Sequence, residues 1–169
     1  MQDVSKHSDS IARLRPWRGT VAPGCFANFL GAQTALEFVA RHPPSNAVIA
    51  PPEGGEAMAR LPTPRDGELF FEFASLLDAV REAEERFVML ELGGGYAARS
   101  VDAALALRRF NPLPAFLLVV EAEPTHFAWA EQHFRANSLD PEQHWLINAA
   151  VSSQNQPVPF LIGAGYYFN

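Results

Sequence analysis

The sequence predicts an α/β protein whose mostly parallel sheet carries flanking helices, and three observations support this class. Two apolar runs, 87–90 and 116–120, each end in an acid, Glu91 and Glu121. Buried parallel strands read as continuous apolar runs because helices cover both of their faces. About thirty residues separate the two acids, which is the length of a strand–helix–strand unit. Three consecutive glycines, 93–95, follow the first run, and glycines permit the sharp turn that joins such a strand to its helix.

Residues 1–65 are expected to form an irregular extension that packs on the core, ahead of a partial α/β domain over residues 66–169. Proline and glycine recur from Val21 to Arg65, and such punctuation excludes long regular elements. Within the extension we expect only a short helical segment near 34–40 and a short strand near 47–50.

The elements after residue 66 follow from hydrophobic periodicity and from helix start and stop signals. Apolar residues recur at helical spacing over 67–85, which predicts an amphipathic helix. Pro112 ends an alanine- and leucine-rich helix, and Pro124 suits the first turn of the next one. The predicted order is helix 67–85, strand 87–92, helix 100–110, strand 115–121, helix 124–137, strand 144–151 and a short strand 158–162.

Composition and charge exclude several classes of partner. The formal net charge of −6 argues against nucleic acid, because phosphate binding needs a basic face. The single cysteine, Cys25, cannot form an internal disulfide, which suits a reducing compartment. No apolar run approaches the ~18–20 residues of a membrane span, and the first residues lack the apolar core of a signal peptide. We therefore expect a cytoplasmic protein that acts on a small molecule.

The glycine loop is the strongest functional signal. Glu91, Gly93, Gly95 and Ala97 follow the pattern acid-x-Gly-x-Gly-x-small. The same stretch also fits the dinucleotide fingerprint Gly-x-Gly-x-x-Ala from Gly93, so the glycines alone do not decide the ligand.

Glu91 decides between the two cofactor classes. A carboxylate beside the loop would repel a pyrophosphate dianion but attract the amino group and sulfonium of S-adenosylmethionine. The sequence therefore favours S-adenosylmethionine over NAD, with Gly93, Gly94, Gly95 and Tyr96 as the cofactor loop. The alternative is that Glu91 only accepts hydrogen bonds from the loop backbone.

The ends of the next two predicted strands supply the remaining candidates for cofactor binding. Glu121 can accept both ribose hydroxyls of either cofactor class. Ala122 is small enough for an adenine ring to lie across it. Asn148, with Ala149 beside it, can hydrogen-bond the exocyclic amine of adenine, or it is a plain strand-end residue. Glu123 is expected to cap the helix that begins at the following proline.

The sequence names neither a metal site nor a general base. The five histidines follow no spacing typical of metal ligands. The residues that would carry catalysis beyond cofactor binding are therefore unknown at this level.

Four stretches of the chain in combination resemble the FkbM-type methyltransferase family. They are 88–96, 119–127, 135–139 and 148–153, within a resemblance that covers roughly residues 66–162. The resemblance implies a Rossmann-like class I methyltransferase fold. It also implies methyl transfer from S-adenosylmethionine, often to a hydroxyl of a sugar or secondary metabolite.

On the matching positions, the resemblance assigns roles to individual residues. Glu91, Gly93 and Gly95 would hold the methionine end of the cofactor, and Glu121 would take the ribose. Asn148 and Ala149 would border the adenine.

The resemblance also has departures. Ala97 stands where a third glycine is common in the family. The family continues with a fourth strand and three more, so a truncated or partial form is expected here. The outer edge of strand 87–92 would then stay open unless the extension or a second subunit, in a homo-oligomer, covers it. Two other functions stay open: an NAD-type oxidoreductase domain, and a non-catalytic binding module with an incomplete methyltransferase fold.

Overall fold

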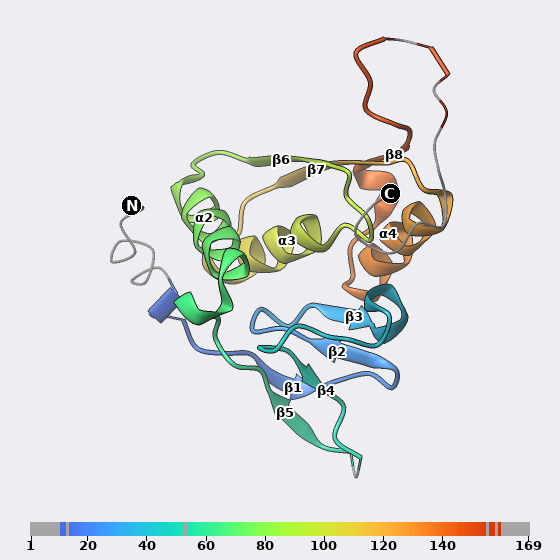
Figure 1. The fold of residues 1–169 in the computed structure, drawn as a ribbon. Helices are drawn as coiled ribbons and strands as arrows, with labels where there is room; N and C mark the ends of the chain where they lie inside the picture. Colours follow the sequence, from blue (N-terminus) through green and yellow to red (C-terminus); the bar gives the residue numbers. More distant parts are fainter. Residues whose placement is uncertain (1–10, 13, 53, 155, 158, 160–169) are drawn as a thin grey trace.

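The computed structural model describes residues 11–12, 14–52, 54–154, 156–157 and 159. The described chain is arranged in three layers (Figure 1). A parallel sheet forms one outer layer, three helices form the middle layer, and two small antiparallel sheets from the N-terminal extension form the third.

The outer sheet contains β6 (Phe87–Leu92), β7 (Ala115–Glu121) and β8 (Trp145–Asn148), in the order β6-β7-β8. Both pairings are parallel. The predicted α/β class with a parallel sheet is therefore confirmed. β8 is shorter than the predicted strand 144–151, and the predicted strand 158–162 lies almost entirely outside the described residues.

The middle layer consists of α2 (Glu68–Glu82), α3 (Ala98–Phe110) and α4 (Pro124–Ala136). α3 contacts β6 and β7, α4 contacts β7 and β8, and α2 packs against α3. All three helices lie on the same side of the sheet (Figure 1). The predicted flanking helices are therefore present, and among the described residues they cover one face of the sheet.

The helix ends are set by side chains that satisfy free backbone groups. The Glu123 carboxylate accepts a hydrogen bond from the backbone N–H of His126 at 2.6 Å, so Glu123 caps α4 as predicted. At the other end of the layer, Nδ2 of Asn111 donates to the carbonyls of Val80 and Ala83 at 2.9 and 2.7 Å. Asn111 thereby ends α3 and ties it to the last turn of α2, whose carbonyls have no helical partner.

The extension is more regular than predicted. β1 (Arg18–Thr20) pairs with β5 (Glu56–Met58), and β2 (Cys25–Ala27) lies between β3 (Gln33–Ala35) and β4 (Val48–Ile49). All of these pairings are antiparallel.

The short connecting helices of the chain are 3₁₀ turns. They are η1 (Leu36–Val39), η2 (Pro64–Asp66) and η3 (Pro141–Gln143). The predicted strand near 47–50 is present as β4. The helical segment predicted over 34–40 is wrong in part, because its first residues complete β3 and only η1 follows.

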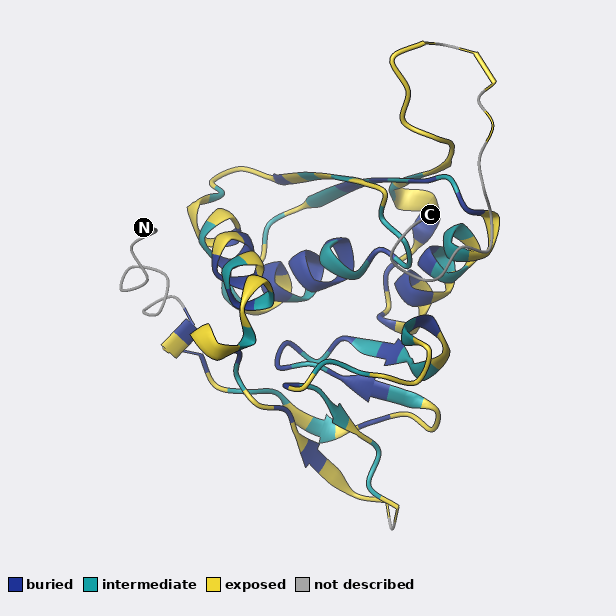
Figure 2. Cartoon of the chain, in the orientation of Figure 1, coloured by how far each residue is buried: buried dark blue, intermediate teal, exposed yellow. Residues whose placement is uncertain are grey.

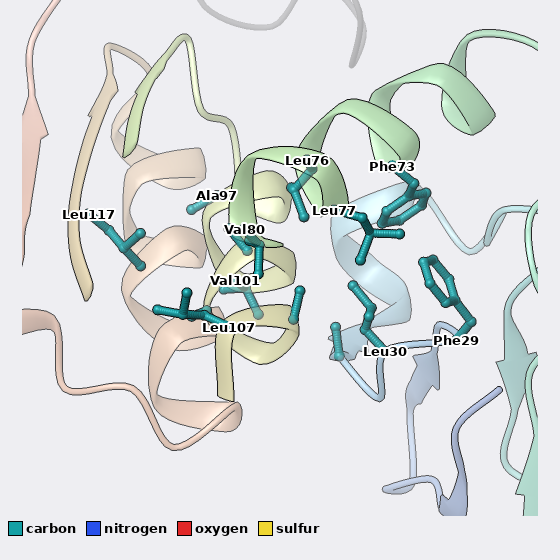
Figure 3. Close-up of a cluster of buried hydrophobic side chains, with 14 of the residues drawn as sticks. Phe29, Leu30, Phe73, Leu76, Leu77, Val80, Ala97, Val101, Leu107 and Leu117 are labelled. Carbon is teal, nitrogen blue, oxygen red and sulfur yellow. The ribbon is translucent and has the colours of Figure 1, made fainter. Parts of the chain in front are cut away.

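The hydrophobic core joins the extension to the helices (Figure 3). Phe29 of the extension meets Phe73 of α2 edge to face, with ring centroids 4.7 Å apart. Leu30, Leu77 and Val101 belong to the same buried cluster. α3 is buried on most sides because the sheet covers one of its faces and the extension another. Ser100 and Asp102 are therefore buried together with its alanine and leucine residues.

The second face of the parallel sheet is not covered by any helix or strand among the described residues, and we call it the bare face (Figure 2). Val88, Leu90 and Leu92 of β6 are 58%, 57% and 55% exposed, and Trp145 and Ile147 of β8 are exposed on the same side. The outer edge of β6 also has no partner strand among the described residues. The strands of the extension pair with one another, so the described part of the extension does not cover this edge.

Candidate functional site

The glycine loop joins β6 to α3, and each of its glycines meets a steric requirement. Gly93 and Gly95 have φ values of +68° and +54°, which side chains disfavour. A Cβ on Gly94 would lie 2.5 Å from Cγ1 of Val119. The backbone N–H groups of Gly93 and Gly94 donate to the carbonyl of Val120 at 2.9 and 3.0 Å, which holds the loop against β7.

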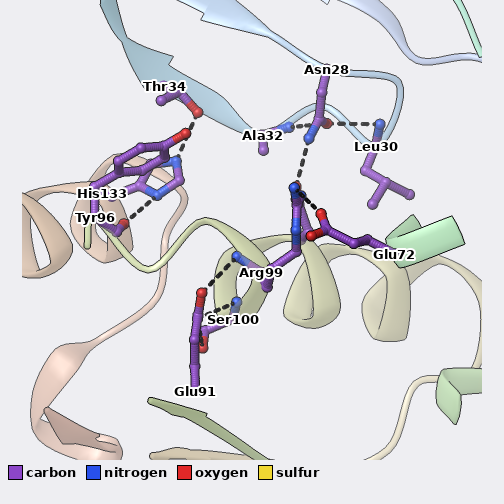
Figure 4. Close-up of polar contacts among 11 residues, drawn as sticks. Asn28, Leu30, Ala32, Thr34, Glu72, Glu91, Tyr96, Arg99, Ser100 and His133 are labelled. Atoms are coloured by element: carbon purple, nitrogen blue, oxygen red, sulfur yellow. Dashed lines mark hydrogen bonds and ion pairs between the residues drawn. The ribbon is translucent and has the colours of Figure 1, made fainter. Parts of the chain in front are cut away.

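Glu91 points toward the start of α3 (Figure 4). Its carboxylate accepts hydrogen bonds from the backbone N–H of Ser100 at 2.9 Å, the hydroxyl of Ser100 at 2.5 Å and the backbone N–H of Arg99 at 3.3 Å. Burial raises the pKa of Glu91, and these hydrogen bonds act in the opposite direction. The geometry thus matches the alternative that Glu91 accepts hydrogen bonds from the backbone.

Glu121 connects the glycine loop to the turn before α4. One carboxylate oxygen accepts from the backbone N–H of Gly95 at 2.6 Å, and the other accepts from the backbone N–H of Glu123 at 2.8 Å. The side chain is buried at the carboxyl end of β7. The structure therefore places the Glu121 carboxylate against the glycine loop.

Asn148 and Ala149 attach the end of β8 to the end of β7. Nδ2 of Asn148 donates to the carbonyls of Glu121 and Ala122 at 2.8 and 3.2 Å. The backbone N–H of Ala149 donates to the carbonyl of Glu121 at 3.1 Å. The predicted cofactor residues from three strand ends thus gather at one edge of the sheet.

A cleft of about 460 Å³ opens at the glycine loop. One wall comes from the loop and the helices behind it, with Gly93, Gly94, Gly95, Tyr96, Ala98, Arg99 and His126. The opposite wall comes from the extension, with Val39, His42 and Pro44. This volume suits a small molecule. The second wall could not be predicted from the sequence, because no local pattern links the extension to a loop about fifty residues later.

A buried histidine fixes the extension, the loop and α4 relative to one another (Figure 4). Nδ1 of His133 lies 2.9 Å from the carbonyl of Tyr96, and Nε2 lies 2.9 Å from Oγ1 of Thr34. A carbonyl only accepts, so Nδ1 carries the proton and the Thr34 hydroxyl donates to Nε2. Burial lowers the pKa of His133 to about 4, which keeps the ring neutral at pH 7. Phe38 of the extension stacks on Trp129 of α4 beside this contact.

A second buried polar cluster lies where the extension crosses α3. Asp102 accepts from Nδ2 of Asn28 at 2.5 Å and from Arg99 at 2.9 Å. Arg99 also pairs with Glu72 of α2 at 2.6 Å and lies over the ring of Phe73. Burial raises the pKa of Asp102 to about 6. This cluster was not predicted, because no sequence pattern links residues that lie on separate elements.

Two further properties concern only the part of the chain that the structure describes. No group of three or more His, Cys, Asp or Glu side chains there is arranged to hold a metal ion. None of the described helices has both the length and the apolar character of a membrane span.

Comparison of the chain with protein-family models, with curated proteins and with solved structures found no match in any of the three.

Proposed function

We propose that this chain binds S-adenosylmethionine at the carboxyl edge of its parallel sheet and transfers the methyl group to a hydroxyl of a small molecule. This activity would make the chain a class I methyltransferase with a Rossmann-like fold, of the FkbM type. Cofactor contacts are proposed for Glu121 and residues 93–96, with Ala122, Asn148 and Ala149 beside the adenine.

The observation that carries the proposal is the position of the Glu91 carboxylate. It holds the backbone N–H groups of Arg99 and Ser100 in the first turn of α3. In dinucleotide-binding domains, the pyrophosphate takes the N–H groups at this helix start. A carboxylate in that position would repel a pyrophosphate and competes for the same donors. A methyl donor that carries no phosphate avoids both conflicts, which favours S-adenosylmethionine over NAD.

Glu121 supports the same ligand through its remaining hydrogen-bonding capacity. Each of its carboxylate oxygens accepts one backbone hydrogen bond, and a carboxylate oxygen has a second lone-pair direction. The two ribose hydroxyls can donate there without displacing the loop. This contact suits either cofactor class, so it supports nucleoside binding and leaves the choice of cofactor to Glu91.

In methyl transfer, the main contribution of the protein is to bind the cofactor and the acceptor and to orient them. The bound cofactor supplies an activated methyl group on its sulfonium. The cleft walls would hold that group and the acceptor oxygen together, and such proximity supplies much of the acceleration in reactions of this type.

Isothermal titration with S-adenosylhomocysteine and with NAD tests the proposal. We expect heat of binding with the first ligand and none with the second. Binding of NAD alone would overturn the assignment and favour the oxidoreductase alternative.

A variant of Glu121 tests the ribose contact. Glu121→Ala removes charge-assisted hydrogen bonds, so we expect S-adenosylhomocysteine to bind about 1.5–3 kcal/mol more weakly. Glu131→Ala is the matched control, because Glu131 lies on α4 and pairs with Arg135, whereas Glu121 accepts a hydrogen bond from the glycine loop. An unchanged affinity in Glu121→Ala, with the fold intact by circular dichroism, would refute the contact.

The bare face and open edge of β6 favour one second candidate, a non-catalytic binding module. As such a module, the chain would pair with a second copy along this edge, because an unpaired edge strand exposes backbone groups that can hydrogen-bond to another chain. Size-exclusion chromatography with light scattering distinguishes the two: a dimer without affinity for S-adenosylhomocysteine supports the module, and a monomer that binds it contradicts the module.

A further inference from the structure

The two walls of the cleft at the glycine loop differ in what they can contribute to methyl transfer. The proposed cofactor residues 93–96 belong to the loop wall. Transfer requires the acceptor oxygen to approach the methyl group from the side opposite the sulfur, with the reacting atoms held in line. The acceptor therefore belongs on the extension wall, which consists of Val39, His42 and Pro44.

A hydroxyl acceptor must lose its proton, and few groups around the cleft can receive it. Among the described residues that line the cleft there is no aspartate or glutamate. The guanidinium of Arg99 has no lone pair to offer, and it is already paired with two carboxylates. On the extension wall, Val39 and Pro44 have apolar side chains. Of the described residues in that wall, only His42 has a side chain that can take a proton.

The imidazole of His42 is held in one tautomer by its own backbone. Nδ1 lies 2.8 Å from the carbonyl oxygen of Ala40. A carbonyl only accepts, so in the neutral ring Nδ1 carries the proton and Nε2 keeps its lone pair. Nε2 is at the end of the ring far from the backbone, His42 is exposed, and no group of the described residues is hydrogen-bonded to Nε2. A base that is oriented through one nitrogen and free at the other can remove a proton from a bound substrate.

The backbone before His42 has an unusual conformation. Ala40 and Arg41 have φ values of +47° and +65°, in the left-handed region that residues other than glycine seldom occupy. The backbone N–H of His42 donates to the carbonyl of Val39 at 2.8 Å, which closes the turn. Two prolines, 43 and 44, follow at once and restrict the chain on the other side. Such backbone is concentrated at functional sites, because the surrounding structure must maintain it.

The second histidine of the cleft has different surroundings. His126 belongs to the loop wall, beside the proposed cofactor residues. Its ring stacks on that of Trp129, with the centroids 5.0 Å apart and the planes 29° from parallel. His126 therefore lies on the cofactor side of the cleft, against an aromatic neighbour, whereas His42 lies on the side where the acceptor must enter.

We propose that His42 is the general base of the methyl transfer and that its Nε2 faces the acceptor hydroxyl in the cleft. The proposal rests on the proposed function for the methyl donor. Nε2 takes the hydroxyl proton while an oxygen lone pair forms the new bond to the methyl carbon. The bond between that carbon and sulfur breaks, and its electron pair stays on sulfur. The products are S-adenosylhomocysteine, an O-methylated acceptor and a His42 imidazolium, which releases its proton to water.

The contact with the hydroxyl is tested by NMR with a matched pair of probes. Ethylene glycol can donate a hydrogen bond, whereas its dimethyl ether has the same two oxygens and can only accept. In the wild-type protein with S-adenosylhomocysteine, we expect ethylene glycol to shift the Nε2 signal of His42 and the ether to leave it in place. The signal that disappears in His42→Asn is the one to follow. An equal response to both probes, or none to ethylene glycol, overturns the proposal.

Two variants of His42 test its role as the base. The side-chain amide of His42→Asn still offers a donor to the Ala40 carbonyl but has no Nε2, whereas His42→Ala has neither. With S-adenosylmethionine and ethylene glycol as the acceptor, we expect both variants to form S-adenosylhomocysteine at least about 100-fold more slowly than wild type. His42→Asn should melt and bind S-adenosylhomocysteine as wild type does.

Two results of these assays reject the base. Full turnover by His42→Asn would show that His42 only stabilises its turn. Wild-type protein that binds ethylene glycol at Nε2 but transfers no methyl group to it would reduce His42 to a hydroxyl-binding residue.

The same measurements separate this proposal from the proposed function. If wild type binds S-adenosylhomocysteine but His42 does not respond to ethylene glycol, the assignment of His42 fails alone. If wild type does not bind S-adenosylhomocysteine, the methyl donor is wrong and the base with it, and a response of His42 to ethylene glycol would then assign only a hydroxyl site.

Discussion

The two faces of the parallel sheet have similar sequences and opposite surroundings. On one face, Leu117 and Val119 of β7 are fully buried beneath α3 and α4. On the other, Val88, Leu90 and Trp145 are more than half exposed. A strand that is buried on one face alternates apolar and polar residues, whereas a strand that is buried on both faces is apolar throughout. The strands of this sheet have the continuous apolar pattern. The sequences of these strands are therefore typical of a sheet that is covered on both faces, whereas the described residues cover only one face.

Alanine substitutions on the two faces should give the largest difference. Leu117→Ala leaves a cavity under the helices, so we expect it to lower the free energy of unfolding by about 2–5 kcal/mol. Leu90→Ala removes a side chain that is 57% exposed, and we expect a loss below about 1 kcal/mol. Urea denaturation of both variants measures the two values. Equal losses would mean that the Leu90 face is covered in solution.

The helices on the covered side carry the buried titratable residues Asp102 and His133. The free energy of unfolding should therefore depend on pH through these two residues. Burial raises the pKa of Asp102 from 3.8 to about 6. Between these values the folded protein binds more protons than the unfolded chain, so this group makes stability fall as the pH rises. His133 acts in the opposite sense, because burial lowers its pKa from 6.5 to about 4. The two contributions therefore offset each other between pH 4 and 6.

Asp102→Asn removes one of the two opposing contributions. The stability of the variant relative to wild type should improve by about 2 kcal/mol between pH 4 and pH 6, because most of the effect of the raised pKa, at 1.36 kcal/mol per pH unit, falls within this range. Urea titrations of both proteins across this range measure the difference. A difference that stays constant with pH would show that Asp102 titrates normally and is not buried beneath the extension.

The bare face should produce the smallest effect on stability and a clear optical signal. An exposed apolar patch binds hydrophobic dyes and invites association. We expect the native protein to enhance the fluorescence of anilinonaphthalene sulfonate. Leu90→Thr combined with Trp145→Thr should remove most of that enhancement while the free energy of unfolding changes little. Dye binding that survives the double variant would place the apolar patch elsewhere on the molecule.

The sequence predicted the parts of the molecule that depend on local patterns. The parallel strands, the three helices and the cap at Glu123 follow from apolar runs, periodicity and start signals. The placement of Glu91, Glu121 and Asn148 toward one edge of the sheet also followed, because parallel strands end at one edge.

The sequence did not predict what depends on contacts between distant segments. Asn28 and Asp102 are 74 residues apart, and Thr34 and His133 are 99 apart. Asp102 on an isolated helix would be assigned to solvent, and only the extension packed over α3 makes it buried. Of the short strands of the extension, only β4 was predicted. The other four, β1, β2, β3 and β5, were missed for the same reason, since each is stabilised by its partner instead of by its own composition.

The link between Thr34 and His133 also sets the order in which the cleft can be completed. The extension is made first by the ribosome, but the helix that fixes it is among the last elements of the described chain to emerge. Closing a loop of that length carries an entropic cost and slows folding. β6, β7 and the glycine turn precede α4 in the chain and can form before it, while the wall provided by Val39, His42 and Pro44 must wait for α4. A ligand present during refolding should accelerate only this last step.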